Sequence, residues 1–318
     1  MPGTRYRPSR WLRNPHLQTM LGSVARRSVV PETERTYLDN AVIEDITTCD
    51  GTVLRARVNR HTEPAPQVVL IHGWLGNDGS SYVRSAGARL WQAGFNTVRM
   101  NLRDHGDTEE LNQDLYNSAR TVEVVDLVDQ YRQRNAGDTA VIGFSLGGNF
   151  ALRVARDTGL PALAVCPAID PGDTLHQIDH GPGALVYRNY FVRKWRASLV
   201  RKAQAFPARY DFSRAFTLRS VSALTDFFVR HHSDFSSTAT YFDAYDLSGN
   251  ALAGVSATIL AAKDDPIIPH ATIRSLPRSL DIVETDWGGH NAFLSDWTLA
   301  SWCDEYVLDW CRKTLRLP

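Results

Sequence analysis

The chain has 318 residues, 43% of them hydrophobic, which is enough apolar material for one large folded core. Its 35 basic and 35 acidic residues give a formal net charge of zero, so we expect no nucleic-acid partner. No apolar run approaches the ~20 residues of a membrane-spanning helix, no signal peptide is recognisable, and no Cys-x-x-Cys pair occurs, so we expect a cytoplasmic protein with free thiols.

The first elements are an extension and a hairpin. Residues 1–40 are rich in Arg and Pro and predict an irregular N-terminal extension. Two alternating runs follow at 41–48 and 52–59, and the pair Asp50-Gly51 between them predicts a β-hairpin.

Short apolar runs then alternate with amphipathic stretches. We predict strands at 67–72, 95–100, 139–144, 161–166, 255–262 and 280–285. Helices are predicted at 81–94, 118–135, 146–158 and about 297–315. This alternation indicates an α/β fold with a mostly parallel sheet that is covered by helices on both faces.

The alternation is interrupted at 171–245, a segment rich in Arg and aromatic residues that we expect to be mainly helical. An insertion there lies beyond the strand ends, where α/β sheets bind ligands. We interpret it as a cap over an active site, with a separate structural subdomain as the alternative. The core is then formed by 41–170 and 246–318.

The segment Gly143-Phe144-Ser145-Leu146-Gly147 matches the pattern Gly-x-Ser-x-Gly between a predicted strand and a predicted helix. This context is typical of the nucleophile elbow of the α/β-hydrolase fold, which makes Ser145 the candidate nucleophile. Gly143 and Gly147 relieve clashes in the strained turn, and the Leu146 N–H can stabilise an oxyanion. An ordinary glycine-rich strand–helix turn is the alternative.

A second glycine-rich loop, His72-Gly73-Trp74-Leu75-Gly76, ends the strand at 67–72. Such a loop supplies the second oxyanion donor in this fold, and we assign that role to the backbone N–H of Trp74. Gly73 and Gly76 let the backbone approach the substrate. We interpret His72 as a structural residue that holds the loop.

A serine nucleophile needs a base and a carboxylate, which follow it in the order Asp or Glu, then His. Asp264 and Asp265 follow the strand at 255–262, and His290 follows the strand at 280–285. We favour Asp265 as the acid because Pro266 restricts its backbone. Asp264 would hold the loop, and Asp170 is a weaker alternative.

The other histidines are more typical of structural or surface positions, including His105 after the strand at 95–100 and His231 and His232 in the insertion. The predicted chemistry needs no metal and no cofactor.

Seven segments carry a more specific resemblance: RNPHLQT (13–19), HGWLGN (72–77), NLRDHGD (101–107), LYNSAR (115–120), GFSLGGN (143–149), AAKDDPIIP (261–269) and GGH (288–290). Together they resemble the YheT-type branch of α/β-hydrolases, which includes the plant EMB8-like proteins and the animal abhydrolase-domain phospholipases. The resemblance covers essentially the whole chain.

The resemblance implies a triad of Ser145, Asp265 and His290 and an esterase or lipase activity on acyl esters. This chain departs from many relatives after the strand at 95–100, because it has Arg103-Asp104-His105 where they have Arg-Gly.

The sequence therefore predicts a serine hydrolase that cleaves carboxylic esters, with a small molecule or a lipid acyl ester as substrate, through an acyl-enzyme intermediate. Acyl transfer, thioester cleavage and amide cleavage use the same triad and are the alternatives. A non-catalytic binding protein is a further alternative, which the intact triad argues against.

The segment 187–206 combines six basic residues with no acidic one. Tyr187, Phe191, Trp195 and Leu199 recur at four-residue spacing, which predicts a helix with one apolar face. In one interpretation this face packs on the core. In the other, a basic amphipathic cap helix contacts an anionic membrane or an acidic substrate group.

Overall fold

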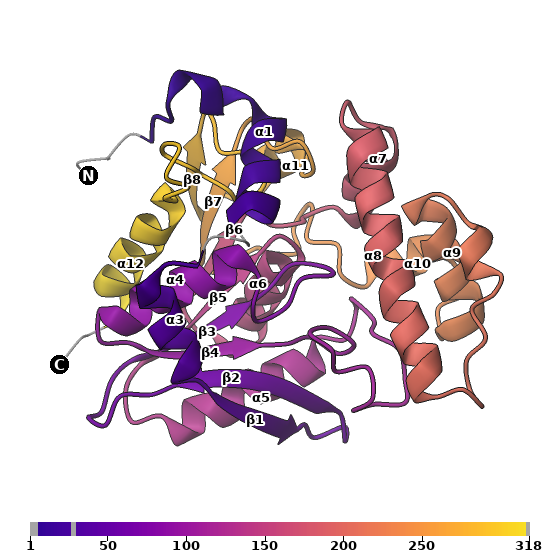
Figure 1. The fold of residues 1–318 in the computed structure, drawn as a ribbon, viewed down its shortest axis with the longest axis horizontal. Helices are drawn as coiled ribbons and strands as arrows, with labels where there is room; N and C mark the ends of the chain where they lie inside the picture. The colour runs from indigo at the N-terminus through magenta and orange to yellow at the C-terminus, as the bar shows by residue number, and fades with distance from the viewer. Residues whose placement is uncertain (1–5, 27–29, 316–318) are drawn as a thin grey trace.

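One eight-stranded sheet runs through the structure, a computed structural model that describes residues 6–26 and 30–315 (Figure 1). The strand order is β1-β2-β4-β3-β5-β6-β7-β8, and β2 runs antiparallel to both of its neighbours. All other pairings are parallel, as the sequence predicts. The strands are β1 Val42–Thr47, β2 Val53–Asn59, β3 Gln67–Ile71, β4 Asn96–Met100, β5 Thr139–Phe144, β6 Ala162–Val165, β7 Thr258–Ala262 and β8 Asp281–Thr285.

The predicted hairpin forms the antiparallel edge of the sheet. Val42 lies opposite Val58 and Thr47 lies opposite Val53 across the β1–β2 pair. Gly51 in the turn has φ 83°, a conformation that only glycine adopts without steric cost.

Helices cover both faces of the sheet. Its central strands are therefore buried along their whole length. On one face α4 (Ser81–Gln92) packs beside α12 (Trp302–Thr314). On the other face α5 (Val122–Arg134) packs beside α6 (Leu146–Thr158). A short helix, α11 (His270–Arg274), follows β7.

The prediction of an irregular extension at 1–40 is wrong for the part that the structure describes. This part contains a 3-10 turn at Arg10–Arg13, α1 (Pro15–Met20), a π-helical turn at Leu21–Ala25 and α3 (Glu32–Asp39). The Asn14 side chain caps α1 by accepting the Leu17 N–H at 3.0 Å, and Pro15 occupies the first helical position. Proline is favoured at the first position of a helix, so a segment that contains Pro15 can still begin a helix there.

The insertion between β6 and β7 forms four α-helices beyond the strand ends, at the right of Figure 1. They are α7 (Pro171–His180), α8 (Ala184–Ala205), α9 (Val221–His232) and α10 (Thr238–Asp243), with a 3-10 turn at Ala215–Thr217. Within the described ranges, no helix combines the length and apolar character that crossing a bilayer requires.

The apolar face of α8 turns toward the rest of the protein. Tyr187 and Leu199 are buried, and Phe191 and Trp195 pack partly buried against the same core. Five of the six basic side chains of the segment also have protein partners, namely Arg188, Lys194, Arg196, Arg201 and Lys202. Contact of this helix with an anionic membrane stays a prediction. Most of its basic side chains already bind other groups of the protein.

One buried ion pair joins α8 to the core. The Lys202 ammonium lies 2.7 Å from the Asp104 carboxylate, and both side chains are almost fully buried. Asp104 has φ 57°, a left-handed conformation that Asp tolerates better than most residues. The Asp104 side chain therefore anchors the cap helix to the loop after β4.

We predict that Lys202→Met lowers the free energy of unfolding by about 3 kcal/mol near pH 8, because Asp104 then stays buried without its cation. Burial already raises the pKa of Asp104 to about 6. Lys202 holds this pKa down, so it lies higher in the variant, and the loss should shrink as the pH falls toward 6, where protonation removes the orphaned charge. Denaturant unfolding at acid and alkaline pH measures both effects.

Arg193→Met is the matched control, because Arg193 is exposed on the same helix and forms no hydrogen bond or ion pair within the described residues. It should change stability by less than about 0.5 kcal/mol. Equal losses from the two variants would contradict the role of the buried pair.

Candidate active site

Ser145 stands on the turn between β5 and α6 with φ 56° and ψ −120°, a strained conformation for a residue with a side chain. The turn is tight, because a Cβ atom at Gly143 would overlap the Gly147 carbonyl and one at Gly147 would overlap the Ile71 carbonyl. Glycine is required at both positions, as the motif predicts. The strain lifts the hydroxyl of Ser145 out of the strand and into the cavity described below.

The structure brings Ser145, His290 and Asp265 into one hydrogen-bonded line. His290 Nε2 lies 2.9 Å from Ser145 Oγ, and His290 Nδ1 lies 2.8 Å from Asp265 Oδ2. The second Asp265 oxygen accepts the N–H groups of Ile267 and Ile268 at 2.8 and 2.9 Å. With Nδ1–H donating to Asp265, Nε2 carries the lone pair that can accept the serine proton, and the Asn291 amide nitrogen lies 3.2 Å from the same Nε2.

Asp264 and Asp170, the other candidate acids, lie in different contacts. Asp264 Oδ1 accepts the Gly289 N–H at 3.0 Å, and its Oδ2 is buried with no hydrogen-bond partner in the structure. Burial, followed by the charge of Asp265, raises the pKa of Asp264 to about 6. Asp170 caps α7 through the Asp173 N–H. Asp264 therefore holds the histidine loop rather than the histidine ring.

The glycine-rich loop after β3 lies directly against the serine, since a Cβ atom on Gly73 would come 3.1 Å from Ser145 Cβ. Gly76 is equally confined, because a Cβ atom there would come 2.9 Å from the Gly73 carbonyl oxygen. Within the described residues, the backbone N–H groups of Trp74 and Leu146 form no hydrogen bond. Both are thus free to donate to an oxyanion.

His72 and His105 do not contact Ser145 but hold the neighbouring loops. His72 Nε2 accepts the Leu102 N–H at 3.1 Å, and His105 Nε2 accepts the Leu75 N–H at 3.0 Å. Each Nδ1 is paired with a backbone carbonyl. Burial lowers the pKa of His72 to about 4 and that of His105 well below its ordinary value, so both rings are neutral. This agrees with the structural role predicted for His72.

The N-terminal helix α1 takes part in the site, which sequence reasoning missed. Thr19 Oγ1 accepts the backbone N–H of His290 at 2.9 Å and donates to the Pro15 carbonyl at 2.8 Å. Gln18 is fully buried and bonds both the N–H and the carbonyl of Leu294. The available signal was the segment NPHLQT, which carried the family resemblance but was given no structural role.

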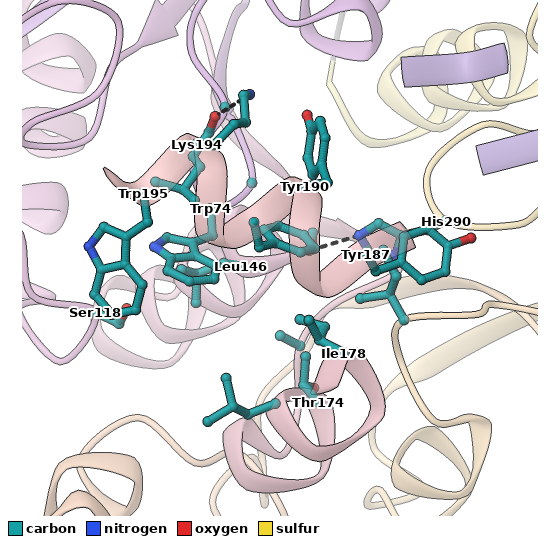
Figure 2. Close-up of a pocket in the computed structure, with 18 of the residues that line it drawn as sticks. Trp74, Ser118, Leu146, Thr174, Ile178, Tyr187, Tyr190, Lys194, Trp195 and His290 are labelled. Atoms are coloured by element: carbon teal, nitrogen blue, oxygen red, sulfur yellow. Dashed lines mark hydrogen bonds between the residues drawn. The ribbon is translucent and has the colours of Figure 1, made fainter. Parts of the chain in front are cut away.

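A cavity of about 520 Å³ opens over Ser145 and His290 (Figure 2). The four insertion helices contribute to its wall together with α1 and the loop after β3. Trp74 stacks on Phe191 with ring centres 5.4 Å apart and meets Trp195 edge-on at 5.0 Å. The wall of the cavity is therefore mainly apolar, which suits a hydrocarbon substrate group.

The atoms of Cys166, Asp265 and His290 lie within 4.8 Å of one another, a grouping that could in principle hold a metal ion. A thiol must ionise to bind a metal, and burial raises the pKa of Cys166 well above its ordinary value. The Asp265 and His290 side chains are already hydrogen-bonded to each other, so these three side chains are poorly suited to bind a metal ion.

A model of the alpha/beta hydrolase family matches residues 68–300. The chain belongs to this family. YheT of Escherichia coli strain K12, which is named as an esterase, is 27% identical over 95% of this chain and 92% of its own length. The embryogenesis-associated protein EMB8 of Picea glauca is 24% identical over 97% of this chain and 72% of its own length. The resemblance to the YheT-type and EMB8-like branch is thereby confirmed.

Solved structures agree on the fold. The Pyrococcus furiosus esterase Pf2001 superimposes with a TM-score of 0.58 at 15% identity, covering 91% of this chain and 98% of that protein. The predicted fold class, an α/β-hydrolase with a mostly parallel sheet, is confirmed, and the family agrees with the predicted hydrolase class.

We predict that Thr19→Val lowers kcat about tenfold or more, because the His290 loop loses the hydroxyl that accepts its backbone N–H. Thr19→Ser keeps this hydroxyl and should retain most of the rate. Steady-state kinetics on a soluble ester, with thermal unfolding of both variants, measures the effect. Full activity in a stable Thr19→Val variant would contradict a positioning role for α1.

We predict that Asp264→Asn stabilises the protein by on the order of 1 kcal/mol near pH 8. The folded state raises the pKa of Asp264 to about 6 from 3.8, so its ionised form costs stability once the pH rises through this range. The gain should fade as the pH falls from 6 to 4. Thermal unfolding across this range measures it, with the exposed Asp243→Asn as control. A gain that grows toward acid pH would contradict the prediction.

Proposed function

We propose that this protein hydrolyses carboxylic esters, with Ser145 as nucleophile, His290 as base and Asp265 as the acid that orients it. The observation that carries the proposal is the position of the His290 ring, 2.9 Å from Ser145 Oγ and 2.8 Å from Asp265 Oδ2. A serine, a histidine and a carboxylate in this order are the components of acyl transfer to serine.

In the first half of the reaction Ser145 Oγ attacks the acyl carbon while His290 Nε2 takes its proton. The negative charge moves to the former carbonyl oxygen, where the N–H groups of Trp74 and Leu146 donate to it. The imidazolium then gives its proton to the leaving alkoxide oxygen, the C–O bond breaks, and an acyl-serine remains.

In the second half His290 removes a proton from water, and the resulting hydroxide attacks the acyl-serine. Collapse of the second tetrahedral intermediate returns the proton to Ser145 Oγ and releases the carboxylic acid. Asp265, one oxygen of which accepts two backbone N–H groups, orients His290 and stabilises the imidazolium.

Acyl transfer to another acceptor and cleavage of thioesters or amides share these intermediates. Ester hydrolysis is the favoured proposal because YheT and the Pyrococcus furiosus relative in fold are both named as esterases. A binding protein without activity would not need a strained serine aligned with a histidine. The buried, unpaired Cys166, Cys303 and Cys311 support a reducing compartment, the cytoplasm.

We predict that a fluorophosphonate probe labels the wild-type protein and not Ser145→Ala, because the probe reacts with an activated serine hydroxyl. Ester hydrolysis by Ser145→Ala should fall by about four orders of magnitude or more. Labelling that survives in Ser145→Ala would place the nucleophile elsewhere.

The two adjacent aspartates give a matched pair of variants. Asp265→Asn should lower kcat/KM about 10⁴-fold, because the amide no longer stabilises the imidazolium. Asp264→Asn should lower it less than about tenfold, because an amide oxygen can still accept the Gly289 N–H. Similar losses in both variants would contradict the assignment of Asp265.

A further inference from the structure

The cavity over the serine has an open end and a closed end. At the open end Met20, Val24 and Val186 form an exposed rim, and Met20 directly follows Thr19, which bonds His290. The closed end is formed by buried residues, among them Ser118 and Tyr241. Figure 2 shows Ser118 and His290 at opposite sides of the cavity, with Leu146 and Trp74 between them.

The closed end carries hydroxyl groups beside the aromatic rings of Phe228 and Phe242. Ser118 Oγ donates to the Tyr116 hydroxyl at 3.1 Å, and the Ser118 N–H donates to the Tyr241 hydroxyl, also at 3.1 Å. Both phenol oxygens thus act as acceptors. Throughout residues 6–26 and 30–315, no hydrogen bond uses the phenolic hydrogen of Tyr116, whereas the Tyr241 hydroxyl also interacts with the Tyr245 hydroxyl. The phenolic hydrogen of Tyr116 therefore remains as a donor for a ligand at this end.

A buried cation lies behind these hydroxyls. Arg153 is 1% exposed and donates to the Ser118 carbonyl at 2.7 Å and to the Ala119 carbonyl at 3.3 Å. Its guanidinium lies 5.8 Å from the ring centre of Tyr245, which lines the cavity. Among the described residues, Arg153 forms no ion pair with a carboxylate. A buried positive charge without a counter-ion is costly, and a nearby anion would reduce that cost.

We propose that the closed end of the cavity is a subsite for an oxygen-bearing end of the acyl chain, above all a carboxylate. The inference rests on the ester hydrolysis proposed above and names its substrate class: esters whose acyl chain ends in a carboxylate rather than in a methyl group. Tyr116 donates to this carboxylate, and Arg153 stabilises its charge from behind the hydroxyls.

The order of product release assigns this end to the acyl group. The alcohol leaves first, while the acyl group is still bound covalently to Ser145, and water must then reach the same carbon. An alcohol group held in the closed end would have no exit past the acyl-serine. The acyl chain therefore extends toward Ser118, and the alcohol leaves across the rim near Met20 and Val186.

The subsite also gives a role to the segment LYNSAR, which carried the family resemblance but has no part in the hydrolytic mechanism. Tyr116 and Ser118 supply the hydroxyls, and the carbonyls of Ser118 and Ala119 hold Arg153 in place. The segment thus forms the closed end of the cavity together with the charge behind it.

The test compares p-nitrophenyl esters in pairs of equal chain length: hexanoate with hydrogen adipate, octanoate with hydrogen suberate, and decanoate with hydrogen sebacate. At neutral pH we expect kcat/KM of wild type to favour the carboxylate-ended ester about tenfold at the length that spans the cavity. The corresponding hydroxyl-ended esters should fall between the two.

Tyr116→Phe removes one donor and should lower this preference about tenfold, measured as the ratio of the two kcat/KM values within the same variant. Using the ratio corrects for any general loss of folded protein. Tyr210→Phe is the matched control, because its hydroxyl donates to the Gln113 carbonyl and Tyr210 does not line the cavity. It should leave the ratio at its wild-type value.

The outcomes separate the two proposals. Hydrolysis of the methyl-ended esters with no preference for carboxylate at any length, or an unchanged ratio in Tyr116→Phe, would overturn the subsite and leave the ester hydrolase standing. Hydrolysis of none of the esters would overturn the ester hydrolase and the subsite with it.

Discussion

The site depends on the orientation of one imidazole ring. His290 is held at Nδ1 by Asp265, faces Ser145 at Nε2, and is tied through its backbone N–H to Thr19. These three partners come from the loop after β7, the turn after β5 and the N-terminal helix, so segments far apart in the chain must converge within hydrogen-bond distance. The sheet makes this convergence reliable, because parallel strands end at the same edge and carry their loops to it.

Buried ion pairs connect the segments that surround the cavity. Lys202 and Asp104 join the cap helix to the loop after β4, and Arg103 pairs with Glu123 beneath that loop. Such pairs add little net stability compared with apolar packing, but a broken pair is costly. They therefore favour one relative position of cap and core over others, and a cavity wall assembled from four helices needs that specificity.

The sequence predicts a structural feature well when that feature depends on a short stretch of neighbouring residues. The hairpin, the strands and the serine turn rest on short patterns with one physical reading, and the structure contains them. Pro266 favours Asp265 over Asp264 as the acid. The structure adds that the next two N–H groups, of Ile267 and Ile268, bind one of its oxygens.

The helix α1 was missed for a physical reason as well. Six residues are too few to show helical periodicity, and its stability comes from tertiary contacts such as those of Gln18 with Leu294. Likewise, no sequence pattern reveals that Arg153 is buried behind a cluster of hydroxyls, because its partners are mostly backbone carbonyls.

The features that the sequence reveals and those that it hides lie in different parts of the molecule. The family match covers residues 68–300 and contains the serine, the acid and the histidine, while Thr19 lies outside it. The Pyrococcus furiosus esterase shares the fold at 15% identity, so the fold alone does not specify the substrate. The surroundings of Ser145 and His290 include the closed end at Ser118, the helices of the insertion, and the helix α1, which bonds His290 through Thr19 and reaches the rim of the cavity. One short helix thus contributes both to the loop of His290, through Thr19, and to the rim of the cavity, through Met20.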